Sequence, residues 1–312
     1  MNAGFVAVHV SIFFVVWLGA MLPTTAFAAD SPAPRVAVTV KPVHSLAALV
    51  MAGVGTPEIL ISGADSPHTH AVRPSEAKTI ESAQLLFWIG PTLESSFAKP
   101  IAALARGKVI SLLDAPGMQV LPIRAAGNIG EETDEKPGEP DPHVWLDPEN
   151  ARAMTRAIAA ALQAADPAHA QAYAANAAEA DRRLAALDAE LREKLAPLRE
   201  LPFIAYHDAY QYLERRYGLT DAGAVTLSPE RAPGARRIDE LRKIIKARQV
   251  RCVFTEPEFR PAIVRTLVAG TGAKIGTLDP EGAQIPAGPD FYFELMRRVA
   301  ESLRGCLTPS AG

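Results

Sequence analysis

Four side chains of metal-binding type follow predicted strands or lie at the exit of a loop. They are His68, His143, His207 and Asp279. Ligands of open α/β sheets bind beyond the carboxyl ends of the strands, so side chains at these positions can meet in one crevice. Two of the four come from each half of the chain, which predicts that the crevice lies between two lobes.

Three imidazoles and one carboxylate suit zinc as the bound ion. Zn²⁺ takes nitrogen and oxygen ligands in tetrahedral geometry, whereas manganese and calcium prefer oxygen. The four residues are dispersed along the chain and no HExxH motif is present. Spacing alone therefore does not define a zinc site, and an ordinary loop role stays open for each residue.

Two more residues are candidates for contacts behind the ligands. Glu256 follows the predicted strand 252–255 and can accept a hydrogen bond from a ligand imidazole, which metal sites usually require. A surface carboxylate is the alternative for Glu256. His70 lies two residues beyond His68, and it can be a ligand, a supporting group or a solvated loop side chain.

Short apolar runs alternate with helical patterns, which predicts βαβ units and parallel sheets. The predicted strands cover residues 36–40, 58–62, 85–89, 109–112, 203–206, 224–227, 252–255 and 274–278. The predicted helices between them cover residues 44–52, 74–83, 93–105, 148–165, 209–217, 238–248, 262–271 and 290–304. We therefore predict an α/β fold of two (β/α) lobes, each with a central parallel sheet.

One long helix is predicted to join the lobes. Ala-rich, charge-laced sequence runs from Asp166-Pro167 to about Leu195, and about 29 residues at 1.5 Å each give about 43 Å. The predicted parts are an N-terminal lobe of residues 30–165, a rigid connecting helix of residues 166–197 and a C-terminal lobe of residues 198–312. Within the first lobe, the acidic, Gly- and Pro-rich residues 127–142 are predicted to form a surface loop.

The N-terminus has the pattern of a secretory signal peptide. Residues 1–29 contain no Lys, Arg, Asp or Glu, and an apolar core at 10–22 precedes Ala26-Phe27-Ala28. We predict a cleaved signal peptide of residues 1–28. An uncleaved anchor is the alternative, because the apolar stretch is nearly long enough to span a membrane.

Composition excludes several classes of protein. A net charge of −3 and a pI of about 6.2 give no basic field for nucleic acid. The only two cysteines, Cys252 and Cys306, are too few for a disulfide scaffold or a four-thiolate metal site. In an exported protein the pair is expected to form a bridge, with two inert buried thiols as the alternative.

Six segments of the sequence carry a family resemblance. They are Lys41-Pro42-Val43-His44-Ser45-Leu46, residues 66–75, Asp141-Pro142-His143-Val144-Trp145-Leu146-Asp147-Pro148, Tyr206-His207-Asp208-Ala209-Tyr210, Thr255-Glu256-Pro257 and Leu278-Asp279-Pro280. Together they resemble the periplasmic metal-binding proteins of ABC importers, and within them the zinc-binding ZnuA type. The resemblance covers essentially all of the chain after the signal peptide.

The resemblance implies two (β/α) lobes joined by a single long helix, with the metal between them. It assigns His68, His143 and His207 as histidine ligands and Asp279 as the carboxylate of the C-terminal lobe. Manganese-type relatives carry Glu where this chain has His207, which favours zinc. A bridge between Cys252 and Cys306 also matches zinc-type members.

This chain departs from the family pattern at two places. Zinc-type relatives often have a His-rich tract before His143, whereas residues 127–142 contain no histidine. A role of this loop in collecting zinc is therefore not implied. Some relatives place Glu directly before the first histidine, where this chain has Pro67. The fourth ligand is then Asp279 or water.

The resemblance predicts a periplasmic, monomeric binding protein that is not an enzyme. It would capture Zn²⁺ and deliver it to a membrane permease whose ATPase is a separate subunit, because this chain has no P-loop of its own. A manganese- or iron-binding protein of the same transporter class is the first alternative. A secreted zinc hydrolase with Glu256 as general base and an adhesin-like surface protein are the others.

Overall fold

The computed structural model describes residues 1, 4, 31–63, 65–124, 138–226, 233–257 and 262–308. Apart from residues 1 and 4, the predicted signal peptide lies outside them, as does the predicted acidic loop up to residue 137. None of the described helices combines the length and apolar character that a membrane crossing needs.

Residues 32–312 contain two four-stranded parallel sheets, which confirms the predicted α/β class. The first sheet has the order β2-β1-β3-β4, and its strands are Glu58–Ile59, Val36–Val38, Leu85–Trp88 and Lys108–Ser111. The second has the order β6-β5-β7-β8, and its strands are Asp221–Thr226, Phe203–His207, Cys252–Thr255 and Lys274–Thr277. Both sheets therefore have the same topology.

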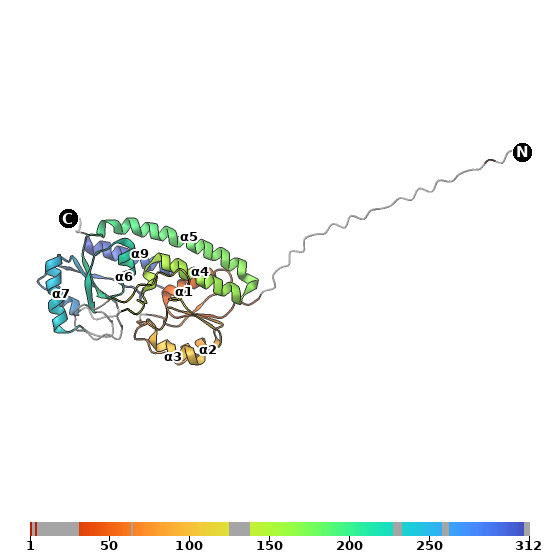
Figure 1. The fold of residues 1–312 in the computed structure, drawn as a ribbon, viewed down its shortest axis with the longest axis horizontal. Helices are drawn as coiled ribbons and strands as arrows, with labels where there is room; N and C mark the ends of the chain where they lie inside the picture. The colour runs from red at the N-terminus through yellow and green to blue at the C-terminus, as the bar shows by residue number, and fades with distance from the viewer. Residues whose placement is uncertain are drawn as a thin grey trace. The chain divides into compact units, whose positions relative to one another are not determined.

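Helices cover both faces of the first sheet. In Figure 1, α1 (Lys41–Val50) and α4 (Pro148–Ala165) lie on one side of it, and α2 (Pro74–Ser82) and α3 (Ser95–Leu104) lie on the other. Helix α1 begins at Lys41, three residues before the predicted start at His44. Pro42 is compatible with this first turn because the backbone N–H it lacks has no partner inside the helix.

The second sheet contributes to two separate apolar clusters. Side chains alternate between the faces of a strand. Ile204 and Val253 pack with α7 (Ala235–Arg248) and α8 (Ala262–Val268). Phe203 and Phe254, on the other face, belong to one continuous core that includes residues of the first sheet and of α9 (Phe291–Leu307). The two lobes therefore share a core, which limits their independent movement.

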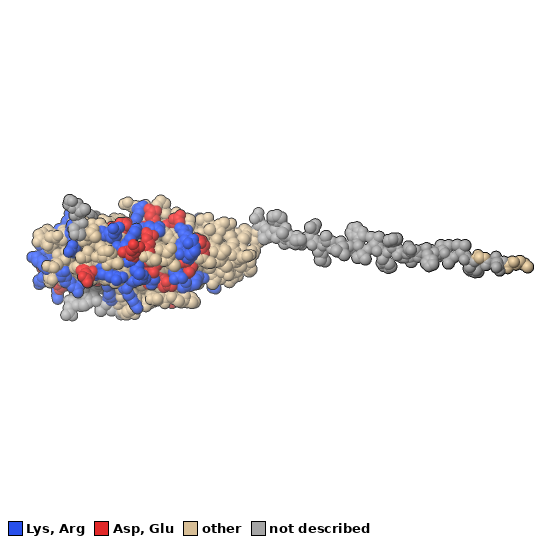
Figure 2. All heavy atoms as spheres, turned by 90° about the horizontal axis from the view of Figure 1, so that it is seen from above, with Lys and Arg blue, Asp and Glu red and all other residues tan. Residues whose placement is uncertain are grey.

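The long helix α5 (Ala170–Leu195) follows a short 3₁₀ turn (Pro167–His169) and is fastened along its length. On one side Asp181 pairs with Arg152 of α4 at 2.7 Å, and on the other Glu190 pairs with Arg297 of α9 at 2.8 Å. Figure 1 shows α5 running beside both lobes, and Figure 2 shows interleaved basic and acidic side chains over this face. The helix is a brace that both lobes contact.

Several strands and helices begin or end at residues other than those predicted. Strand β6 starts at Asp221, three residues before the predicted start, and Gly223 within it has φ 123°. An internal glycine hides strand character in a sequence pattern because it carries no side chain. Helix α8 ends at Val268 and not at residue 271, because Gly270 and Gly272 both have positive φ. Helix α6 (Gln211–Tyr217) ends at Gly218, also with positive φ.

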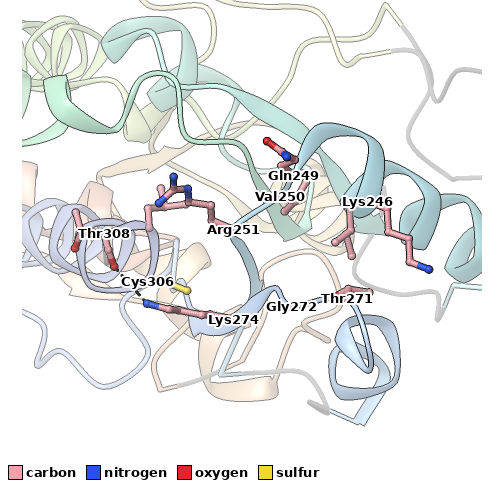
Figure 3. A pocket seen from close by; sticks show the side chains of 11 residues that line it. Lys246, Gln249, Val250, Arg251, Thr271, Gly272, Lys274, Cys306 and Thr308 are labelled. Atoms are coloured by element: carbon pink, nitrogen blue, oxygen red, sulfur yellow. Dashed lines mark hydrogen bonds between the residues drawn. The ribbon is translucent and has the colours of Figure 1, made fainter. Parts of the chain in front are cut away.

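The predicted bridge between Cys252 and Cys306 is present. It joins the first residue of β7 to the last turn of α9, at the amino edge of the second sheet. Figure 3 shows Cys306 in the wall of a pocket at this edge. His207 ends the neighbouring strand β5 at the opposite, carboxyl edge.

Replacing both cysteines by alanine is predicted to lower the free energy of unfolding by about 4 kcal/mol, because the bridge closes a loop of 54 residues in the unfolded chain. Zinc affinity should not change, because the bridge and His207 lie at opposite edges of the sheet. Chemical denaturation and a zinc titration of both proteins measure the two effects. Equal unfolding midpoints would contradict the stabilising role.

Candidate metal centre

Three histidines meet at one point between the lobes. The ligand nitrogens of His68, His143 and His207 all lie within 4.8 Å of one another. Nε2 of His143 lies 3.2 Å from Nε2 of His68 and 3.3 Å from Nε2 of His207. His143 and His207 are buried, and His68 is partly buried.

Each histidine is positioned by a different element. His68 lies in the connection between β2 and α2, beyond the carboxyl end of β2. His143 directly precedes the 3₁₀ turn Val144–Leu146. His207 was predicted just after its strand. It is instead the last residue of β5, because it pairs with Thr226 of β6 and so makes the strand one residue longer than predicted. The carboxyl ends of β2 and β5 thus lead to two members of the cluster, and the segment before the 3₁₀ turn supplies the third.

Buried carboxylates fix the orientation of two imidazoles. Nδ1 of His207 donates to the Glu256 carboxylate at 2.7 and 2.8 Å, and Nδ1 of His143 donates to Oδ1 of Asp141 at 2.9 Å. A carboxylate only accepts hydrogen bonds, so these contacts assign the proton to Nδ1 in both rings. The Nε2 lone pairs of His143 and His207 then face each other at 3.3 Å.

This arrangement fits a tetrahedral cation. Zinc–nitrogen bonds of 2.0–2.1 Å in tetrahedral geometry place neighbouring nitrogens about 3.3 Å apart. The Nε2–Nε2 distances from His143 to His68 and to His207, 3.2 and 3.3 Å, are close to this value. Two facing lone pairs repel each other unless a cation or a proton lies between them. The carboxylates that accept from Nδ1 of His143 and of His207 are also the usual support of a histidine bound to zinc.

The surroundings of His68 favour its neutral form. Burial, followed by the nearby imidazoles of His143 and His207, holds the pKa of His68 well below its usual range. Zinc binds the neutral imidazole, so this environment keeps His68 in the state that can bind the ion.

Sequence reasoning identified Glu256 but not Asp141 as a support. Asp141 is buried and also accepts the backbone N–H of His143 at 3.0 Å, which makes a tight local turn in Asp141-Pro142-His143. An acidic residue two positions before a histidine is the signal that could have indicated this contact.

His70 supports the loop that carries His68 and does not point to the other histidines. Its Nε2 lies 2.9 Å from the Glu76 carboxylate, and its ring stacks on Phe97 with 5.7 Å between centroids. The side chain is buried, which excludes the solvated alternative. Glu76 also accepts the backbone N–H of Arg73, which fixes the start of α2.

Asp279 is not part of the cluster formed by the described residues. Its carboxylate accepts the backbone N–H groups of Glu281, Gly282 and Ala283 at 3.1, 2.6 and 2.8 Å. Nζ of Lys41 binds the carbonyls of Gly282 and Ala283, each at 3.0 Å, and so holds the same loop from the N-terminal lobe. Asp279 as a ligand stays a prediction.

A separate pocket of about 640 Å³ lies at the amino ends of β7 and β8. No histidine, aspartate or glutamate lines it. Figure 3 shows the side chain of Lys246 directed away from those of Arg251 and Lys274, so the three cations do not converge on one point. Nothing in its lining resembles a metal site.

Comparisons with known proteins identify the family of this chain. Residues 36–306 match the family model of the periplasmic zinc-uptake complex component A. The high-affinity zinc uptake system protein ZnuA of Brucella suis is 41% identical over 305 residues, which cover 88% of this chain and 91% of that protein. The protein of the same name in Paracoccus denitrificans is 34% identical, with 93% of this chain and 97% of that protein covered.

Solved structures share the fold. A crystal structure of ZnuA aligns with a TM-score of 0.74 at 23% identity, covering 88% of this chain and all of that one. The laminin-binding protein of Streptococcus agalactiae, described as a bifunctional protein with adhesin and metal transporting activity, aligns with a TM-score of 0.75 at 26% identity and the same coverage. A manganese-bound periplasmic protein of Candidatus Liberibacter asiaticus aligns with a TM-score of 0.73 at 20% identity.

Proposed function

We propose how this chain coordinates and delivers zinc, starting from the fact that it belongs to the ZnuA family, the periplasmic component A of zinc-uptake complexes. The chain is the zinc-binding component of a high-affinity uptake system for ABC import, and it is not an enzyme. The metal site of this transport protein is the histidine cluster.

Zinc is held by Nε2 of His68, His143 and His207. The observation that supports this assignment is the convergence of these nitrogens within 4.8 Å, with two of their three separations, 3.2 and 3.3 Å, close to the edge length of a tetrahedral zinc site. The fourth position belongs to water or to Asp279. Water is favoured because Asp279 is not among the described residues whose ligand atoms converge at the cluster.

The ligand chemistry favours zinc over manganese or iron as the cargo. Three neutral nitrogens suit zinc, whereas manganese sites are richer in oxygen. The alternative cargo remains the second candidate, and a competition titration decides between the two. The hydrolase alternative has no support in the site, because Glu256 binds His207 and is not directed at an open metal position.

Delivery requires partners outside this chain. We infer export through a cleaved signal peptide of residues 1–28 and transfer of zinc, by a monomer, to a membrane permease powered by a separate ATPase. We also propose that the first lobe ends near residue 165 and that the second begins after residue 197, with the connecting helix between them. The shared core and the brace α5 imply that zinc enters and leaves through small lobe movements.

Replacing His143 or His207 by alanine is predicted to weaken zinc binding by about a hundredfold or more, since loss of a supporting contact alone costs about 10- to 100-fold. Titration of metal-stripped protein with Zn²⁺, Mn²⁺ and Fe²⁺ against a chromophoric chelator measures this. His169→Ala, in the turn before α5 and paired with Asp166, is the matched control and should bind like the wild type. Unchanged zinc affinity in both ligand variants would place the site elsewhere.

Zinc affinity is predicted to fall as the pH drops from 8 to 5. Protons compete with zinc for imidazole nitrogens, which ordinarily titrate near pH 6.5. Because burial lowers the pKa of His68, this ligand keeps its lone pair at pH values where an exposed histidine is already protonated. The chelator titration at several pH values tests the competition, and a flat profile would argue against histidine ligands.

A further inference from the structure

A two-stranded stem leads into the ligand His143. It consists of residues 121–124 and 138–141, which pair antiparallel through Pro122 and Pro140. The backbone N–H of Ile123 donates to the carbonyl of Glu139 at 2.7 Å, and that of Asp141 donates to the carbonyl of Leu121 at 2.8 Å. The stem ends at Asp141, whose carboxylate orients His143.

Helix α6 of the C-terminal lobe holds both strands of this stem. The hydroxyl of Tyr212 donates to the carbonyl of Asp141 at 2.7 Å and accepts the N–H of Leu121 at 3.0 Å. Nε2 of Gln211 donates to the carbonyl of Pro122 at 3.1 Å and to Oδ2 of Asp141 at 2.8 Å. Gln211 is only four residues beyond His207 in the sequence.

Gln211 and His143 bind the two different oxygens of one carboxylate. Oδ2 of Asp141 accepts from Gln211, and Oδ1 accepts from both Nδ1 and the backbone N–H of His143. Both hydrogens of the Gln211 amide are used, one on Pro122 and one on Asp141, so the amide has a defined orientation. A continuous series of contacts therefore connects α6 in one lobe to a zinc ligand in the other.

We propose that Gln211 is a positioning residue for zinc binding, a role that rests on the proposed function. By fixing Oδ2, it prevents the Asp141 carboxylate from rotating and keeps Oδ1 directed at His143. Helix α6 begins four residues after His207, so a short segment joins the helix that holds the stem to the strand that carries the other ligand. The two ligands from different lobes thus keep the 3.3 Å separation that a tetrahedral ion requires.

Other contacts hold the stem in place without Gln211, which makes the role testable. Arg124 at the end of the first strand pairs with Glu214 at 2.8 Å and Asp221 at 3.1 Å, and it also contacts Asp208. Together with Tyr212, this ion-pair group keeps the stem on the C-terminal lobe. A change at Gln211 is therefore confined to the Asp141 carboxylate and the Pro122 carbonyl.

Gln211→Met tests the proposal because methionine has nearly the same size and helix preference but no donor. We expect Zn²⁺ to bind about 3- to 10-fold more weakly, somewhat less than the loss from removing a direct support of a ligand. The measurement is competition with a chromophoric chelator at one pH. Gln84→Met is the control, since exposed Gln84 accepts a backbone N–H of Arg35 before β1 and should bind like the wild type.

A double-mutant cycle separates positioning from a general structural effect. Asp141→Ala should weaken zinc binding about 10- to 100-fold, and Gln211→Met should then cause no further loss, because it acts through Asp141. Equal losses with and without Asp141 would overturn the proposal. If Asp141→Ala does not fold, Asp141→Asn replaces it, and the Gln211→Met effect should shrink in that background.

The outcomes also separate this proposal from the proposed function. A wild-type protein that binds zinc, with Gln211→Met binding equally tightly, overturns only the role of Gln211. A wild-type protein that binds no zinc overturns the proposed function itself. The thermal unfolding midpoint of zinc-free Gln211→Met should match that of the zinc-free wild type. A lowered midpoint would mean that the weaker binding reflects a loss of stability, and it would favour a general structural role for Gln211.

Discussion

The metal site depends on three neutral imidazoles whose Nε2 atoms must all point to one place. Such atoms carry lone pairs, and bringing them within 3.3 Å is unfavourable without a cation between them. Buried carboxylates at Nδ1 hold two of the rings in this arrangement by accepting the ring proton. The rest of the fold keeps these carboxylates and rings in place, so that binding the ion costs little reorganisation.

Two sheets of identical topology provide the frame. Their carboxyl edges face the interlobar region, and parallel strands bring loops of distant sequence to the same edge. The shared apolar core and the brace α5 limit the lobes to small movements. A binding protein built this way gains affinity from a prepared site. Its release of zinc must then rely on local changes near the ligands or on contacts with the proposed permease.

Much of this was predictable from the sequence, because strand and helix patterns are local. The alternation of apolar runs predicted both sheets, positions after strands made His68 and His207 candidates, and the loop exit and the family resemblance added His143 to the same set. The contacts of Gln211 and Tyr212 with the stem were not predictable, because they join segments about 90 and 70 residues apart that only the fold brings together. The alternatives for His70 stayed open for the same reason, since its contact with Phe97 joins it to helix α3.

X-ray absorption at the zinc edge of the zinc-loaded protein tests the central claim most directly. The account predicts one zinc per chain with three imidazole nitrogens at 2.0–2.1 Å and one oxygen. When His68 is replaced by alanine, the fitted number of imidazole rings around zinc should fall from three to two. A first coordination sphere of oxygens alone, or one with fewer than three imidazoles in the wild type, would contradict it.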